Sequence, residues 1–246
     1  MPLILNDLDT RVRLAVKAFW SAQKAALKAK RRSKRKDTGR RGALTSGQHL
    51  AAFAQLISKI VAENGLPESD IRTRGDEVTI PGYFRATKSW DLLIVHRGLL
   101  VAAVELKSMG SSFGNNLNNR AEEILGQSLD FLKAHERRIF RDSPKPFLGY
   151  CVLLADEPGA HRKVGASSPH FAVLPEFDGA SYAQRFAILC QKMVEEELYS
   201  EACVLLTPPV AGSTDGAYSH LDESTSFKRF AAGLAAHVAK IAANQK

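Results

Sequence analysis

The sequence predicts one α/β domain, a mixed β-sheet flanked by helices, with a basic helical arm in front of it. A length of 246 residues with 45% hydrophobic content is enough for one sizeable core. Stretches typical of buried strands alternate with stretches of helical periodicity, which favours a sheet covered on both faces. Residues 1–41 carry a net charge of +10 and residues 42–246 a net charge of −2. We therefore expect the arm at 1–41 and the α/β domain at 42–246.

The arm is expected to begin as a helix and to end as a basic tract. Asp9 or Thr10 can cap the helix, and Lys28–Arg41 holds a single acid among its basic residues. Such a tract binds nucleic-acid phosphates through counterion release, whereas the simpler alternative is a solvated helix end or tail. The apolar residues at helical spacing are Val12, Val16, Phe19, Trp20 and Leu27. The basic residues expected at DNA phosphates are Lys30, Arg31, Arg32, Lys34, Arg35 and Lys36.

A second helix is predicted from Thr45, where apolar residues recur on one stripe until Asn64 and Gly65 stop it. Residues 71–85 then contain two turn signals around a short strand at 78–80. This segment leads into the stretch around which the domain is organised.

That stretch, residues 89–107, reads SWDLLIVHRGLLVAAVELK and predicts a β-hairpin. Two apolar runs flank a turn in which Gly98 tolerates a positive φ. A three-residue turn with a bulge at Gly98 places Asp91 opposite Glu105. A turn one residue shorter pairs Asp91 with Val104 unless a later bulge corrects the register. Glu105 and Lys107 share one face of their strand because side chains alternate.

The convergence of two carboxylates and a lysine predicts a metal-dependent hydrolytic site. Asp91 and Glu105 repel each other unless a cation lies between them, and hard oxygen ligands suit Mg²⁺. We expect the Leu106 carbonyl to complete the protein ligands. Lys107 could hold or deprotonate the attacking water, and the metal would offset charge that builds up on phosphorus. The pattern thus indicates phosphodiester hydrolysis, whereas a surface ion pair with a turn aspartate is the structural alternative.

Asp91, thirteen intervening residues and then Glu105-x-Lys107 form the PD-(D/E)XK nuclease pattern, with Trp90 in the usual place of Pro. With SMGSSFGNNLNNR after it, the region from Tyr83 to Phe131 closely resembles the XhoI family of type II restriction endonucleases. The resemblance implies a restriction-endonuclease-like fold and a Mg²⁺-dependent homodimer that cuts double-stranded DNA at CTCGAG and leaves 5′-phosphates. It also implies a partner DNA methyltransferase that protects the host's sites.

The segment 108–119 is expected to be a loop that faces DNA, with a helix over 120–140 after it. Asn can bind adenine and Arg can bind guanine through two hydrogen bonds each. Turn geometry and helix capping are the alternative explanation for so many Asn and Gly residues. The candidate DNA contacts are Asn115, Asn116, Asn118, Asn119 and Arg120.

The helix over 120–140 is expected to bury Ala121, Ile124, Leu125, Ser128 and Leu132 and to leave Gln127 off that stripe. Gln127 is nevertheless a candidate to support the active site, as are the acids Glu63 and Glu77. Negative charge near the start of a helix is sufficient to explain Glu122 and Glu123.

The second half of the chain predicts alternating strands and helices. We expect strands at 147–155, 171–174 and 202–206, and helices at 180–200 and 226–243. The sequence contains no P-loop and no zinc-protease motif. Its three cysteines have irregular spacing, so we expect reduced core thiols.

Two other functions fit the same residues. One is a repair or structure-specific nuclease of this fold, and the other is a DNA-binding protein without catalysis that uses the basic tract alone. The acidic start MPLILNDLDTR does not fit a signal peptide, and no apolar run is long enough to span a membrane. We therefore expect a cytoplasmic protein. The bases read by each side chain, the dimer surface and the number of metal ions per site cannot be deduced from the residues.

Overall fold

The computed structural model describes residues 2–32, 48–110 and 113–244, and within these ranges it leaves the side chains of 29–32, 48, 115 and 116 out. Its centre is a five-stranded sheet in the order β1-β4-β5-β6-β7. The strands are β1 (Ile71–Arg72), β4 (Leu92–His96), β5 (Leu99–Met109), β6 (Phe147–Ala155) and β7 (Glu201–Thr207). The first three strands pair antiparallel, and β5, β6 and β7 pair parallel. The predicted mixed sheet is confirmed.

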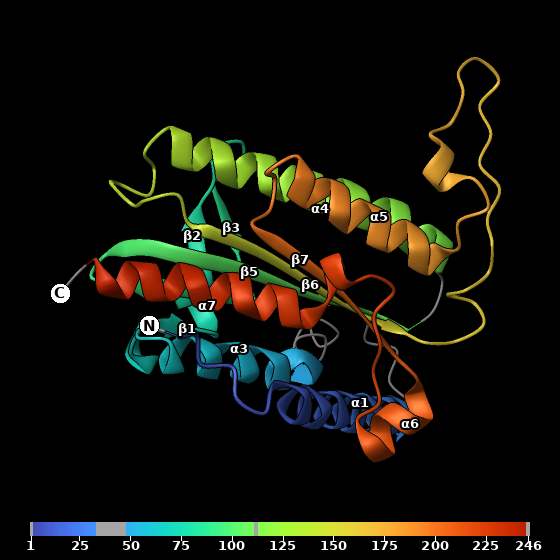
Figure 1. Cartoon of the computed structure of the whole chain (residues 1–246), viewed down its shortest axis with the longest axis horizontal. Helices are drawn as coiled ribbons and strands as arrows, with labels where there is room; N and C mark the ends of the chain where they lie inside the picture. Colours follow the sequence, from blue (N-terminus) through green and yellow to red (C-terminus); the bar gives the residue numbers. More distant parts are fainter. Residues whose placement is uncertain (1, 33–47, 111–112, 245–246) are drawn as a thin grey trace.

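Helices cover both faces of this sheet, as Figure 1 shows. On one face lie α4 (Phe113–Glu136) and α5 (Tyr182–Glu195). On the other lie α7 (Phe227–Ala243), which packs on β6 and β7, and α3 (Ala51–Glu63), which packs on α7. The outer layer there consists of α1 (Leu8–Arg32) and α6 (Pro209–Asp215).

The N-terminal helix α1 belongs to the same core as the sheet. Its apolar side chains at Val16, Phe19 and Trp20 are buried in the one large apolar cluster, and Trp20 Nε1 donates a hydrogen bond to Thr207 Oγ1 at 2.9 Å. Neither Asp9 nor Thr10 caps this helix, because α1 begins at Leu8 and both residues lie inside it. The Asp9 carboxylate accepts hydrogen bonds from Arg13 and Tyr218 instead. A domain boundary at residue 41 stays a prediction, since 33–47 lie outside the described residues.

A second, two-stranded sheet lies beside the main one. β2 (Thr79–Pro81) and β3 (Thr87–Ser89) pair antiparallel, with Ile80 opposite Lys88. The connection between them is fastened to α4 by buried Asp130, whose Oδ1 accepts the backbone N–H groups of Tyr83 at 2.9 Å and Phe84 at 2.6 Å. This small sheet leads directly into β4.

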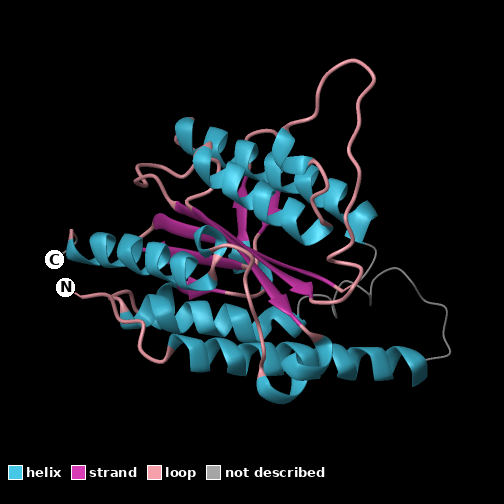
Figure 2. Cartoon of the chain, turned by 45° about the vertical axis from the view of Figure 1, so that its right-hand side comes forward, coloured by secondary structure: helices cyan, strands magenta, loops and turns pink. Residues whose placement is uncertain are grey.

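The C-terminal half differs from expectation at one segment. Residues 171–174 do not form a strand, and the side chain of Phe171 is 82% exposed. They belong to the long excursion between β6 and α5 that projects from the body of the molecule in Figure 2. The observed β6, β7, α5 and α7 match the other predicted elements to within a few residues, and α6 was not predicted.

The three cysteines lie in the core as free thiols. Cys151 on β6 is opposite Cys203 on β7, and Cys190 lies on α5. Burial raises the pKa of the Cys190 and Cys203 thiols above their usual range. In the described part of the chain no helix is long and apolar enough to cross a membrane.

Candidate active site

The β4–β5 hairpin turns more tightly than a three-residue loop. Arg97 and Gly98 both have positive φ, of 49° and 79°, as a two-residue turn of the mirror-image type requires. Val95 therefore pairs with Leu100, but a bulge shifts the register so that Leu92 pairs with Val104. The alternative with a shorter turn and a later bulge is the correct one. Continued by one step, this register places Asp91 opposite Glu105.

Asp91, Glu105 and Lys107 come together as predicted. Asp91 Oδ2 accepts the backbone N–H of Leu106 at 2.7 Å, which ties the residue before β4 to β5. Lys107 Nζ forms an ion pair with Glu105 Oε1 and lies 4.0 Å from Asp91 Oδ2. The Glu105 side chain is 4% exposed and that of Asp91 is 36% exposed. The site is thus a buried acid beside a more accessible one, with a lysine between them.

Two further charged residues were not predicted. Lys88 Nζ lies 2.9 Å from Glu105 Oε2, so each oxygen of this carboxylate faces a lysine. Glu123 Oε1 lies 3.6 Å from Lys107 Nζ, and the other Glu123 oxygen pairs with Arg120. The role given to Glu122 and Glu123 at a helix start is wrong, because α4 begins at Phe113 and both acids lie in its third turn.

Helix α4 also turns amide and acid side chains toward the sheet. Gln127 is buried and donates a hydrogen bond from Nε2 to Glu123 Oε1 at 3.0 Å. It therefore lies on the buried face, while Leu125, expected there, is 40% exposed. The difference is explained by a charged cluster, because partly buried charges need polar partners on the facing helix. The cluster consists of Lys88, Asp91, Glu105, Lys107, Arg120 and Glu123. Gln127 belongs to the site through Glu123.

The charges in the cluster determine how its groups hold their protons. Burial raises the pKa of Asp91, and the nearby Glu105 charge raises it further, against the opposing effect of Lys107. Burial alone would lower the pKa of Lys107, but Glu105 and Asp91 outweigh it and the pKa is raised. Lys107 is therefore a cation at neutral pH in this arrangement. It suits orientation of a water molecule and stabilisation of negative charge better than removal of a proton.

The donor set fits a hard divalent cation. Carboxylate oxygens of Asp91 and Glu105, with a backbone carbonyl and water, are ligands that Mg²⁺ accepts. Buried Gln127 Oε1 has no hydrogen-bond partner among the described residues, so an acceptor for a metal-bound water is present nearby. No group of three or more His, Cys, Asp or Glu side chains is gathered for a metal in the described ranges. A metal here would thus depend on two carboxylates, a backbone carbonyl and water.

Two acids considered as extra ligands lie elsewhere. Glu63, at the end of α3, pairs with Arg11 at 2.8 Å. Glu77 is exposed and lies 4.0 Å from Arg72. Each has a basic partner outside the cluster, so the structure does not bring either acid to Glu105.

The residues expected to contact DNA are only partly described. The segment 108–119 is not a loop, because β5 extends to Met109 and α4 begins at Phe113. Asn118 and Asn119 are exposed on the first turns of α4, and Arg120 is held by Glu123. Asn115 and Asn116 lie in the same helix, and their side chains are outside the described residues. The same holds for the side chains of Lys30, Arg31 and Arg32 and for the whole of Lys34, Arg35 and Lys36.

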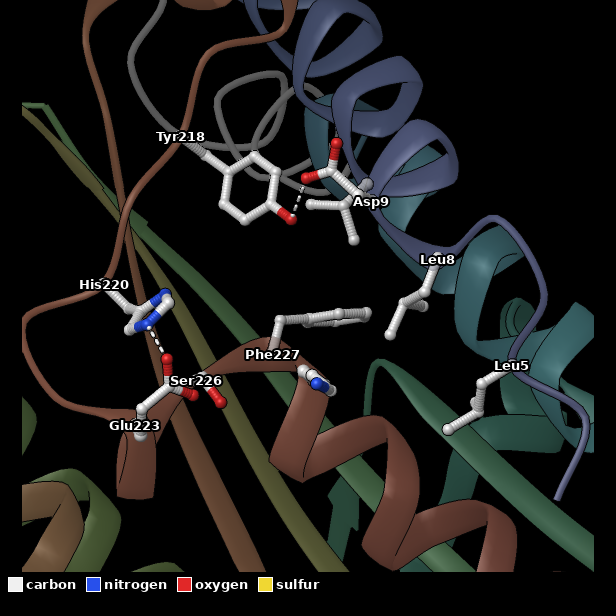
Figure 3. A pocket seen from close by; sticks show the side chains of 10 residues that line it. Leu5, Leu8, Asp9, Tyr218, His220, Glu223, Ser226 and Phe227 are labelled. Atoms are coloured by element: carbon white, nitrogen blue, oxygen red, sulfur yellow. Dashed lines mark hydrogen bonds and ion pairs between the residues drawn. The ribbon is translucent and has the colours of Figure 1, made fainter.

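A second hollow lies between the start of α1 and the start of α7. It is a cavity of about 410 Å³, lined by apolar Leu5, Leu8 and Phe227. Figure 3 shows two separate polar pairs at its edge, Tyr218 with Asp9 and His220 with Glu223. None of the cluster residues lines this cavity.

Comparison with known proteins identifies the family. The family model described as restriction endonuclease XhoI matches residues 28–220. The type II restriction enzyme BstVI of Geobacillus stearothermophilus is 42% identical over 214 residues, which cover 85% of this chain and 95% of that protein. The type II restriction enzyme XhoI of Xanthomonas vasicola is 41% identical over 218 residues, which cover 87% of each. The type II restriction enzyme AbrI of Azospirillum brasilense is 39% identical over 172 residues, 70% of this chain and 77% of that protein.

No solved structure matches the chain. The matched region includes the whole charged cluster, from Lys88 to Glu123, and also Gln127. The chain therefore belongs to the XhoI family of type II restriction endonucleases, which are site-specific deoxyribonucleases.

Proposed function

We propose that the chain cleaves both strands of DNA at the palindrome CTCGAG in a Mg²⁺-dependent reaction that leaves 5′-phosphates. The observation that carries the chemistry is the meeting of Asp91, Glu105 and Lys107 on one hairpin. The target sequence rests on the family resemblance of residues 83–131. We expect the enzyme to act in the cytoplasm, where the DNA lies.

In this mechanism Asp91 and Glu105 would hold the metal together with the Leu106 carbonyl. When bound, Mg²⁺ would lower the pKa of a coordinated water and counter charge on the phosphate. Lys107, kept protonated by its two acidic neighbours, orients the water for in-line attack. The water oxygen forms a bond to phosphorus as the bond from phosphorus to O3′ breaks, so the products are a 5′-phosphate and a 3′-hydroxyl.

A palindromic target implies two active sites related by a two-fold axis, so we propose a homodimer. Basic side chains near the end of α1 would hold phosphates, and the first turns of α4 would approach the bases. A methyltransferase that modifies the same sequence is the expected functional partner. The residues proposed at DNA are Asn115, Asn116, Asn118, Asn119, Arg120, Lys30, Arg31, Arg32, Lys34, Arg35 and Lys36.

Digestion of a plasmid of known sequence with Mg²⁺ tests the proposal. The intact protein should give discrete fragments whose ends map within CTCGAG, and ligation without added kinase should rejoin them because the ends carry 5′-phosphates. Glu105→Ala should give none. Glu77→Ala, the matched loss of an exposed acid outside the cluster, should cleave as the intact protein does.

The outcomes separate the parts of the proposal. Discrete cutting at another sequence would leave the site standing and overturn the target. Unchanged cleavage by Glu105→Ala would overturn the active site. Full activity in the presence of a strong chelator would overturn the metal dependence.

A further inference from the structure

Two lysines face the buried carboxylate of Glu105. Lys107 pairs with Oε1 and Lys88 with Oε2, at 2.9 Å for the second pair. The carboxylate is 4% exposed, so solvent contributes little to its stabilisation. Lys107 also lies near Asp91 and Glu123, at 4.0 and 3.6 Å, so its charge is shared among three carboxylates. Lys88 therefore contributes a cation to Glu105 that Lys107 does not supply by itself.

The position of Lys88 differs from that of Lys107. Lys107 lies on β5, in the middle of the main sheet, whereas Lys88 reaches in from β3 of the small sheet. Its side chain is 10% exposed, and its ammonium lies 4.3 Å from the centre of the Trp90 ring. A lysine carries its charge on a flexible four-carbon stem, so the ammonium can leave Glu105 while the backbone stays in place. The Trp90 face offers it a second favourable contact.

The charges of the cluster balance without a metal ion. Asp91, Glu105 and Glu123 supply three negative charges, and Lys88, Lys107 and Arg120 supply three positive ones. A divalent cation bound by Asp91 and Glu105 would leave two positive charges in excess in a partly buried site. It would also need a Glu105 oxygen, and Lys88 lies against one of them. Lys88 and the metal thus compete for the same carboxylate.

We propose that Lys88 is a positioning residue that neutralises Glu105 in the metal-free enzyme and is displaced when the divalent metal binds. This inference rests on the proposed function, because it assumes that Glu105 is a metal ligand. In the metal-free enzyme, Lys88 holds the Glu105 carboxylate in the orientation needed to bind the metal. It also pairs with the charge of this carboxylate, which would otherwise be buried without a second partner. The cost is a weaker affinity for free Mg²⁺.

Calorimetric titration of the DNA-free protein with Mg²⁺ alone tests this proposal, with thermal unfolding as a second readout. Lys88→Met should bind Mg²⁺ at least about tenfold more tightly than the intact protein, which corresponds to about 1.4 kcal/mol. Its Tm should be lower than that of the intact protein without metal, and the gap should close at saturating Mg²⁺. Lys88→Arg, which restores the cation, should return the affinity toward that of the intact protein.

Lys192→Met is the matched control, because Lys192 pairs with Glu176 at 2.7 Å away from the cluster. It should leave Mg²⁺ affinity unchanged. Equal or weaker Mg²⁺ binding by Lys88→Met would overturn the inference, and so would the absence of binding by both proteins. If the intact protein also fails to cleave, the proposed function falls with it. If the intact protein cleaves normally but Lys88→Met binds Mg²⁺ with unchanged affinity, only the inference about Lys88 is overturned and the proposed function stands.

Discussion

The charged cluster at β5 and the cavity between α1 and α7 both contain ionisable groups, but they use them differently. In the cavity, Tyr218 pairs with Asp9, and His220 pairs with Glu223 three residues away. These carboxylates are exposed, with 63% and 81% of their side chains accessible. Such pairs contribute little, because water competes with each partner. We therefore interpret the cavity as a surface hollow whose polar side chains already have hydrogen-bond partners.

In the cluster, by contrast, charged groups from β3, β5 and α4 are brought together at partly or fully buried positions, with Glu105 the most buried at 4% exposure. Folding gains little from such an arrangement, since hydrophobic residues of similar size would often serve stability as well or better. Concentrated buried charge thus indicates function more reliably than the presence of a cavity does. The following changes test this contrast, from the largest expected effect to the smallest.

Asp91→Asn should lower the cleavage rate by a factor on the order of 10³ or more, because it removes one of two carboxylates from the metal site. The same change should raise the Tm of the metal-free protein at pH 7. The pKa of Asp91 is raised above its unfolded value near 3.8, so the folded state favours the protonated form of Asp91 more than the unfolded state does. Its stabilising contribution is complete below that value and is lost as the pH rises through the folded pKa.

Asparagine keeps the neutral form at every pH, so the gain in Tm should shrink as the pH falls toward 4. Thermal unfolding across this range, without metal, measures it. Asp76→Asn, at an exposed acid before β2, should alter neither cleavage nor Tm. A lower Tm for Asp91→Asn at pH 7 would mean that the Asp91 charge stabilises the fold, and the contrast with the cavity would weaken.

Asp130→Ala should destabilise the protein by about 1–3 kcal/mol, because the N–H groups of Tyr83 and Phe84 lose a carboxylate acceptor and Arg85 loses its partner. Asp130 fastens the β2–β3 connection to α4, so cleavage should also fall. Urea unfolding measures the stability, and cleavage is measured well below the midpoint. Stability equal to that of the intact protein would show that the small sheet does not depend on this anchor.

Glu123→Gln should lower the cleavage rate by about tenfold, equivalent to about 1.4 kcal/mol, while Mg²⁺ affinity changes little. Glutamine keeps the shape and the hydrogen bond to Gln127 but removes a charge 3.6 Å from Lys107. The pKa of Lys107 should fall as a result, so the high-pH limb of the rate profile should move to lower pH. A uniform loss of rate at every pH would assign Glu123 a structural role.

Tyr218→Phe should change stability by less than about 1 kcal/mol, since it removes one partly exposed hydrogen bond at the edge of the cavity. Cleavage should not change. A loss of cleavage in a variant that unfolds at the normal temperature would show that the cavity takes part in function. That result would break the contrast between the two regions.

Much of the architecture could be predicted because its signals are local. β6 matches its predicted range of 147–155, because a run of nine buried residues is recognisable from its apolar composition alone. The Asp91–Glu105 pair was predicted because a hairpin joins residues that are near in sequence. Lys88 was missed because it lies on β3 of the small second sheet. Its contact with Glu105 depends on how the two sheets pack, and no pattern in the sequence indicates that packing.

Other errors have equally specific causes. The start of α4 was placed too late, because Asn and Gly residues normally favour turns, and this moved Glu123 from the third turn to the first. Residues 171–174 have strand composition but no strand partner, so their apolar side chains are left exposed. In both cases the structure of the segment is determined by its packing against the rest of the protein and not by its local sequence.

The buried thiols give the protein a built-in reporter of its own opening. Cys151, Cys190 and Cys203 are the only cysteines in the chain, and all three are shielded by β6, β7 and α5. A thiol reagent cannot reach them until this half of the sheet separates, and the raised pKa of Cys190 and Cys203 leaves little thiolate to react before then. The rate of labelling therefore counts opening events in a native sample. It needs neither DNA nor metal, so it can compare the resting and metal-loaded enzyme directly.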